Sequence, residues 1–193
     1  MNQQKMGIVE ATWPFPKVSI DLLSWQMIME YARQCDVEIN GFGLVDYDPL
    51  RGTIRLSGVF ITKQDASMYG VEIDDADLHR HMYTLSKTGV SASRVKFQWH
   101  SHVDMPTYFS HVDTANIDRW SGDLLVSLVV NKRGEWKCRV DLYKPLRLSF
   151  DVELSVEWPA ASEALQAQVG VDMTEKVVLK KEPSWRRKRR LAQ

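Results

Sequence analysis

The side chains best suited to chemistry are concentrated in residues 99–113, where His100 and His102 lie two positions apart. The pair comes at the end of residues 95–99, which we expect to form a β-strand. Side chains alternate along a strand, so both imidazoles should point to one side and Ser101 to the other. Two neutral imidazoles side by side suit zinc.

Asp113 offers a third ligand to the same metal. It follows a loop and falls in the first turn of a helix expected at residues 110–120. Three protein ligands leave the fourth tetrahedral position of zinc for water, which is typical of a catalytic rather than a structural site. Asp104 is an alternative ligand, but we interpret it as a loop carboxylate.

Hydrolysis of an amide also needs a group that takes a proton from water and delivers it to the leaving amine. Glu38 is a candidate for this general acid/base, since it precedes Gly41 and Gly43, where the backbone can turn tightly. Ser110 lies three residues before Asp113, so the two share a helix face, and Ser110 could donate a hydrogen bond to the developing oxyanion. Two simpler interpretations stay open: Glu38 as a surface acid, and Ser110 with Asp113 as a capping box.

Together these residues resemble the motif of the JAMM metalloprotease family, also called MPN+ or JAB. The resemblance consists of His100-Ser-His102, seven residues, Ser110, two residues and Asp113, with Glu38 and Gly41 upstream. It covers every position of the motif. The order of the elements expected in residues 18–143 also follows the family.

The resemblance implies a fold, a metal and a set of roles. The fold would be α+β with mixed α/β order, a curved and largely antiparallel sheet flanked by helices, of the cytidine deaminase-like type. His100, His102 and Asp113 would bind one zinc ion per chain, Glu38 would be the general acid/base, and Ser110 would stabilise the tetrahedral intermediate. Members of the family are zinc peptidases that cut isopeptide or peptide bonds at the C-terminus of ubiquitin or ubiquitin-like proteins. We therefore expect a deubiquitinase-like hydrolase that acts on a ubiquitin-like protein or another protein substrate.

The segment departs from many eukaryotic members at one position, because Val103 stands where they have proline directly after the second histidine. The long insertions with which those members hold ubiquitin are also missing. The chain therefore resembles the bacterial and phage-encoded branch more closely. Two other functions stay open: a bacterial or phage processing peptidase without a ubiquitin-like substrate, and a non-catalytic MPN scaffold.

The elements that must position these residues fit one metalloprotease domain at residues 16–169, after an N-terminal arm at residues 1–15. Their mixed order predicts an α+β or α/β class. Helices are expected at residues 21–35, 74–87 and 110–120, with a short helix at 160–168. Strands are expected at residues 42–47, 53–62, 95–99, 124–130, 136–143 and 146–158.

The formal net charge of zero hides a basic C-terminal end. Residues 180–190 contain seven basic side chains and one acidic one, so the rest of the chain is acidic. We expect residues 170–193 to be a flexible basic tail that could contact an acidic partner or nucleic acid. The sequence contains neither an apolar run long enough to span a membrane nor a secretory signal, so we expect an intracellular, cytoplasmic protein.

Overall fold

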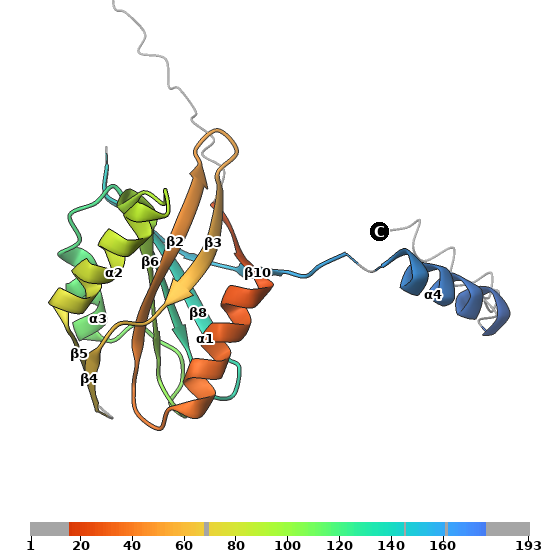
Figure 1. The fold of residues 1–193 in the computed structure, drawn as a ribbon, viewed down its shortest axis with the longest axis horizontal. Helices are drawn as coiled ribbons and strands as arrows, with labels where there is room; N and C mark the ends of the chain where they lie inside the picture. Colours follow the sequence, from red (N-terminus) through yellow and green to blue (C-terminus); the bar gives the residue numbers. More distant parts are fainter. Residues whose placement is uncertain (1–15, 68–69, 145, 161, 177–193) are drawn as a thin grey trace, which may run out of the picture. The chain divides into compact units, whose positions relative to one another are not determined.

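The computed structural model describes residues 16–67, 70–144, 146–160 and 162–176, which form four α-helices and ten β-strands (Figure 1). The helices are α1 (Leu22–Gln34), α2 (Asp75–Lys87), α3 (His111–Asp118) and α4 (Glu163–Lys176), with a 3₁₀ turn at Ala92–Arg94. The strands are β1 (Lys17–Asp21), β2 (Asn40–Asp48), β3 (Thr53–Phe60), β4 (Gln64–Ser67), β5 (Gly70–Ile73), β6 (Val95–Ser101), β7 (Leu124–Val130), β8 (Trp136–Leu142), β9 (Leu148–Val152) and β10 (Leu154–Glu157). The expected helices at residues 21–35, 74–87 and 110–120 are confirmed as α1, α2 and α3.

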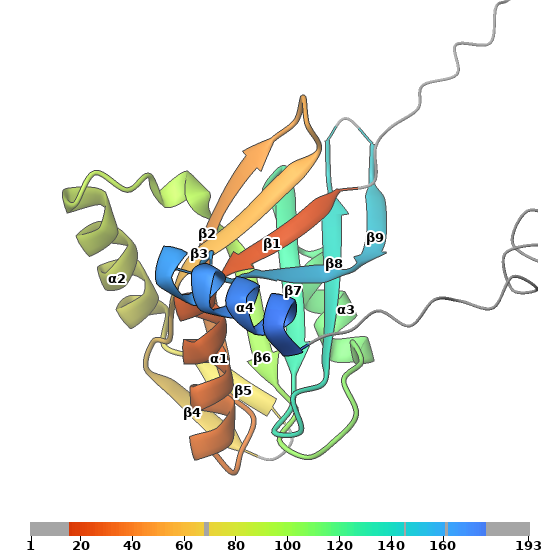
Figure 2. The same cartoon turned by 90° about the vertical axis from the view of Figure 1, so that its right-hand side faces the viewer.

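Eight strands form one mixed sheet in the order β10-β1-β3-β2-β6-β7-β8-β9, and β4 pairs with β5 in a separate hairpin. Four of the seven neighbouring pairs in the large sheet are antiparallel, while β10-β1, β1-β3 and β6-β7 are parallel. Residues 146–158, expected as one strand, form two, β9 and β10, which only Glu153 separates. These consecutive strands lie at opposite ends of the sheet order, so the sheet must curve until its edges approach each other; Figure 2 shows β9 beside β8 at one edge.

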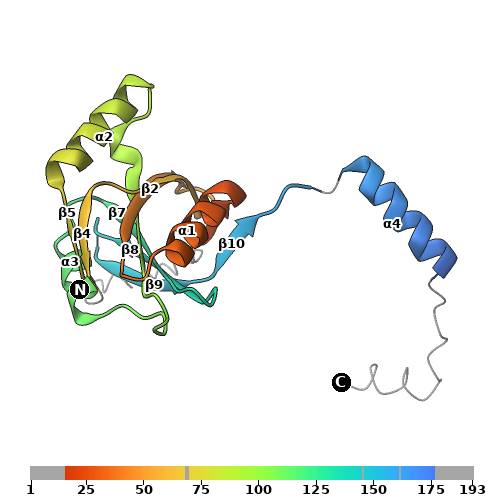
Figure 3. The same cartoon turned by 60° about the horizontal axis from the view of Figure 1, so that its bottom comes forward.

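α1 packs against one face of this curved sheet (Figures 1 and 3). The helix begins after Asp21, whose carboxylate accepts a hydrogen bond from the backbone N–H of Ser24 at 2.9 Å. Ile28 and Ala32, one turn apart, are fully buried on the side of α1 that faces the strands. The ring of Trp99 on β6 is also fully buried there, so β6 is held firmly on its α1 face.

α2 and α3 lie on the other face of the sheet (Figure 1). α2 begins after Asp74, which accepts a hydrogen bond from the backbone N–H of Asp77 at 3.0 Å. A second apolar cluster lies beneath α2, where the ring of His81 stacks on Phe60 with centroids 3.9 Å apart. The domain is therefore a mixed α/β protein whose large curved sheet has helices on both faces.

Beyond the first compact unit, which ends at Trp158, the structure describes α4. The helix expected at residues 160–168 instead runs over Glu163–Lys176, with Gly170 inside it. The arm at residues 1–15 and the basic run at residues 180–190 lie outside the described residues, so the expectations about both stay predictions. Within the described part of the chain, no helix is both long and apolar enough to cross a membrane.

Candidate metal centre

The two histidines of the site are fixed by the end of β6. Ser101 is fully buried between them, and its hydroxyl accepts a hydrogen bond from the backbone N–H of Ile39 at 3.2 Å. The backbone N–H of His102 donates to the carbonyl oxygen of Val130 at 2.8 Å, which extends the pairing of β6 with β7. Both imidazoles consequently point to the α3 side of the sheet, with their Nε2 atoms 3.2 Å apart.

Asp113 reaches the histidines from the first turn of α3. Ser110 caps this helix: the backbone N–H of Asp113 donates to Ser110 Oγ at 3.1 Å, and Asp113 Oδ2 accepts the backbone N–H of Ser110 at 2.7 Å. The capping-box interpretation is therefore correct, and it fixes the direction of the carboxylate. His100 Nε2 lies 3.6 Å from Asp113 Oδ2, so capping and proximity to the histidines occur together.

The donor atoms of His100, His102 and Asp113 all lie within 4.8 Å of one another, close enough to hold one metal ion. The separations of 3.2 and 3.6 Å are near the roughly 3.3 Å expected between ligands of a tetrahedral zinc with bonds of about 2.0–2.1 Å. The donor set of two imidazoles and one carboxylate also suits zinc. The residues therefore fit a three-ligand metal site with an open fourth position.

His102 is prepared for metal binding by a hydrogen bond on its other ring nitrogen. Its Nδ1 lies 2.9 Å from the carbonyl oxygen of Pro106. A carbonyl oxygen only accepts hydrogen bonds, so Nδ1 carries the proton and Nε2 keeps its lone pair for a metal. The following residue, Val103, has a φ of +48°, a left-handed conformation that costs a β-branched residue about 1–2 kcal/mol.

His100 is kept neutral by its surroundings. Burial lowers the pKa of His100 from 6.5 to about 4, against the opposing effect of the nearby Asp113 carboxylate, while His102 lowers it further. At neutral pH the imidazole is therefore uncharged, which is the form that binds a metal ion.

Glu38 lies in the segment between α1 and β2, close to the three candidate ligands. Its backbone N–H donates to the carbonyl oxygen of Ser67 at 3.1 Å, and this bond ties the segment to the β4-β5 hairpin. Burial raises the pKa of the Glu38 carboxyl, and the negative charge of Asp113 raises it further, while His102 opposes the shift. A carboxyl group with a raised pKa in a cleft is suited to accept a proton and return it.

Gly41 has a steric role on β2, which brings Glu38 towards the histidines. A Cβ atom on Gly41 would overlap the indole ring of Trp99, which is fully buried. The absence of a side chain therefore lets this ring lie directly over Gly41 where β2 pairs with β6, and the pairing places Asn40 opposite His100. This close approach explains Gly41 better than the tight turn expected from the sequence.

All five residues expected from the sequence line one cleft of about 310 Å³: Glu38, His100, His102, Ser110 and Asp113. Asp104 and His111 are exposed, and neither belongs to the metal-ligand group that the described residues form. Sequence reasoning missed Asn40, Tyr108 and Asn116, which also line the cleft. Only the register of β2 with β6 brings Asn40 beside His100, and this register has no local sequence signal.

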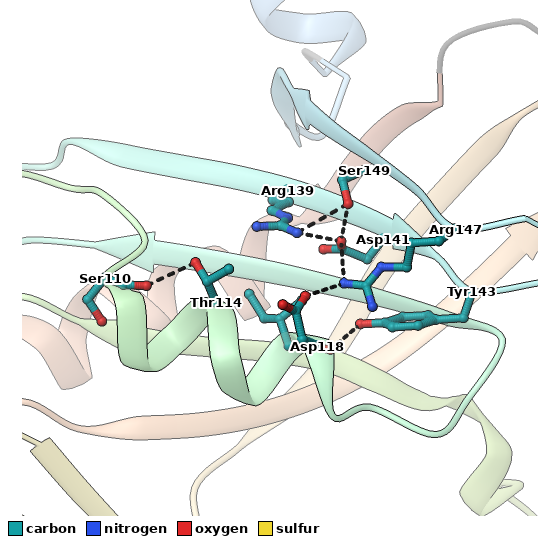
Figure 4. Close-up of polar contacts among 9 residues, drawn as sticks. Ser110, Thr114, Asp118, Arg139, Asp141, Tyr143, Arg147 and Ser149 are labelled. Atoms are coloured by element: carbon teal, nitrogen blue, oxygen red, sulfur yellow. Dashed lines mark hydrogen bonds and ion pairs between the residues drawn. The ribbon is translucent and has the colours of Figure 1, made fainter.

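The C-terminal end of α3 is held to the sheet by polar contacts that Figure 4 shows in close-up. The hydroxyl of Tyr143 donates to the carbonyl oxygen of Ile117 at 2.6 Å, and Arg147 donates to the carboxylate of Asp118 at 2.6 Å. Asp141 on β8 is fully buried and accepts hydrogen bonds from Arg139 at 2.7 Å and Ser149 at 2.5 Å (its contacts are also drawn in Figure 4). These contacts hold the C-terminal end of α3 against the sheet, while the capping box at its other end fixes Asp113.

Neither a family model nor a curated protein matches this chain. The resemblance to the JAMM family therefore depends on the motif of Glu38, His100, His102, Ser110 and Asp113. The metal centre itself depends on the distances and hydrogen bonds described above.

Proposed function

We propose that the chain is a zinc-dependent metallopeptidase of the JAMM type. Its substrate would be an isopeptide or peptide bond at the C-terminus of a ubiquitin-like modifier. The observation that carries the reaction class is the single cleft in which Glu38 lies beside three mutually close ligands, His100, His102 and Asp113. The class of substrate rests on the resemblance of the motif alone.

The chemistry divides between a bound metal and the side chains around it. His100, His102 and Asp113 would hold a zinc ion, which would supply a Lewis acid and make a water molecule more acidic. Glu38, whose pKa is raised, accepts the proton of the nucleophilic water and then donates it to the nitrogen of the leaving amine. The same carboxyl group thus acts first as base and then as acid.

Ser110 would stabilise the negative charge that develops on the carbonyl oxygen of the substrate. Its hydroxyl donates to Asp113 Oδ2 at 2.6 Å, and its backbone N–H donates to the same oxygen at 2.7 Å. When the hydroxyl turns towards a substrate oxygen, Asp113 keeps the backbone hydrogen bond. The ligand therefore stays in place while Ser110 donates to the oxyanion.

The test compares Glu38→Gln with Asp104→Asn, an exposed carboxylate from the loop between the ligands. Hydrolysis of isopeptide-linked ubiquitin-like substrates should fall by about 10²–10⁴ in Glu38→Gln, because the amide can neither accept nor deliver the proton. Zinc content should be unchanged in both variants, and Asp104→Asn should keep full activity. Full activity of Glu38→Gln would refute its role. Cleavage of peptides with no preference for ubiquitin-like substrates would refute only the substrate class.

A further inference from the structure

A small polar pocket lies between the sheet and α3, directly behind His100. The pocket has a volume of about 30 Å³, enough for one water molecule. The polar residues that line it include Asn40, Gln98 and Ser127. The register places Asn40 opposite His100 on one side and Ser127 opposite Gln98 on the other. The pocket therefore touches a candidate metal ligand from the side of the sheet.

Two residues that line this pocket carry a buried side-chain oxygen with no hydrogen-bond partner in the part of the chain that the structure describes. One is Oδ1 of Asn40, and the other is Oγ of Ser127, a residue with only 4% of its surface exposed. Buried polar atoms without a partner are rare, because each costs about 1–3 kcal/mol. Two such atoms around a space large enough for a water molecule indicate a site for one.

His100 differs from His102 in the partner of its second ring nitrogen. A histidine that binds a metal through Nε2 carries its proton on Nδ1, and this N–H almost always donates to an acceptor. In His102 the acceptor is the carbonyl oxygen of Pro106. Among the described residues, the only side-chain atom within hydrogen-bonding distance of a His100 ring nitrogen is Nε2 of His102, which lies beside His100 Nε2, so His100 Nδ1 has no acceptor there.

We propose that this pocket binds one ordered water molecule that accepts a hydrogen bond from His100 Nδ1 and donates to Asn40 Oδ1 and Ser127 Oγ. The water would make three hydrogen bonds, the usual number for a buried water. Asn40 and Ser127 are then positioning residues: they hold the water that holds the imidazole. The inference rests on the proposed metal site but goes beyond it, because it assigns a function to two residues outside the motif.

The experiment measures zinc affinity by competition with a chelator in two variants of nearly equal shape, Ser127→Thr and Ser127→Val. Both add bulk to the pocket wall, but only threonine keeps the hydroxyl. Zinc affinity should fall by about 10–100-fold in Ser127→Val, the usual loss when a metal-bound histidine loses its supporting contact, and should stay within about threefold of the parent in Ser127→Thr. The visible spectrum of the cobalt-loaded protein should change only in the valine variant, because the ligand geometry changes with it.

Two further substitutions keep the inference testable if the valine variant does not fold. Asn40→Leu removes the acceptor oxygen, while Asn40→Asp keeps it, so only the leucine variant should lose affinity. Thr62→Val is the control, because Oγ1 of Thr62 is also buried without a partner but lies outside the pocket; this variant should bind zinc like the parent.

Each outcome has one meaning. Equal zinc affinity in both members of each pair, with normal binding by the parent, would overturn the water site and leave the proposed function intact. Failure of the parent to bind zinc or cobalt would overturn the proposed function and, with it, this inference.

Discussion

The two faces of the central strands have opposite compositions. On β6 the side chains towards α1 include Phe97 and Trp99, both buried in the apolar core, while Gln98 and His100 face α3. β7 shares the alternation in part: Val126 and Leu128 belong to the core beneath α1 and Ser127 faces α3, although Leu125 and Val129, on the same side as Ser127, are also buried and apolar. A single set of strands therefore carries a dense core on one face and the candidate site on the other.

The difference appears most clearly in the buried polar atoms that have no partner. Of the seven such atoms in the described residues, four belong to side chains of the α3 face: Asn40 Oδ1, Ser127 Oγ, Arg139 Nε and Asp141 Oδ2. Trp99 Nε1 lies in the core beneath α1, and the other two belong to Thr62 and Arg94. Such atoms lower stability, so a fold tolerates them where they serve another purpose. The packing of the apolar face stabilises the fold and offsets the cost of the unpaired polar atoms on the α3 face.

Replacement of Trp99 by alanine should give the largest change in stability. Removal of this fully buried ring should lower the free energy of unfolding by about 3–5 kcal/mol, measured by urea denaturation. The control is Lys96→Ala on the opposite face of β6, where Lys96 makes a surface ion pair with Asp123 at 2.6 Å. This variant should lose less than about 1 kcal/mol. Equal losses of unfolding free energy in Trp99→Ala and Lys96→Ala would contradict the claim that the α1 face of β6 contributes most of the stability.

The α3 face should make the stability of the metal-free protein depend on pH. Burial lowers the pKa of His100 to about 4 from 6.5, so between these values the unfolded chain binds a proton that the folded protein does not. The free energy of unfolding therefore rises with pH through this window and levels off above about 6.5. Between pH 7 and pH 5 the contribution of His100 should fall by about 2 kcal/mol.

Urea denaturation at both pH values measures this change, with His100→Gln as the comparison. In His100→Gln, the difference in the free energy of unfolding between pH 7 and pH 5 should be about 2 kcal/mol smaller than in the parent, because glutamine does not titrate. Trp99→Ala should instead keep the pH dependence of the parent while losing stability at every pH. An unchanged pH dependence in His100→Gln would show that another group is responsible.

The smallest effect is expected at the C-terminal end of α3. Tyr143→Phe removes the hydrogen bond to the carbonyl oxygen of Ile117 and should cost about 1 kcal/mol of stability. Burial raises the pKa of Tyr143 to about 12, with Asp141 adding to the shift, so its hydroxyl remains a donor at neutral pH. Zinc affinity should change less than threefold, because the capping box fixes Asp113 at the other end of the helix. A larger loss of affinity would mean that the two ends of α3 are coupled.

Much of the site could be predicted from the sequence because its signals are local. Alternation along β6 placed His100 and His102 on one side, and the three-residue spacing of Ser110 and Asp113 predicted both the helix start and the direction of the carboxylate. Glu38 lies far from these residues in the sequence, so only the motif suggested its position. Its chemical role stays a prediction.

The features that the sequence did not predict depend on contacts between segments far apart in the chain. Asn40 and Ser127 reach His100 only through the register of β2, β6 and β7, which single-sequence patterns do not specify. The split of residues 146–158 into β9 and β10 depends on the closing of the sheet, because the two strands pair with opposite edges. α4 extends past the expected end at residue 168 with Gly170 inside it, since a glycine within a helix costs only about 1 kcal/mol.

The central claim, a metal centre on the α3 face, is tested most directly by elemental mass spectrometry of the purified protein. The parent should contain about one zinc per chain, as a three-ligand site with an open position predicts. His100→Ala and Asp113→Ala should lose it, whereas the exposed His111→Ala should keep it. A parent without zinc after supplementation, or equal zinc in the ligand variants and the control, would contradict the metal centre and favour a non-catalytic scaffold.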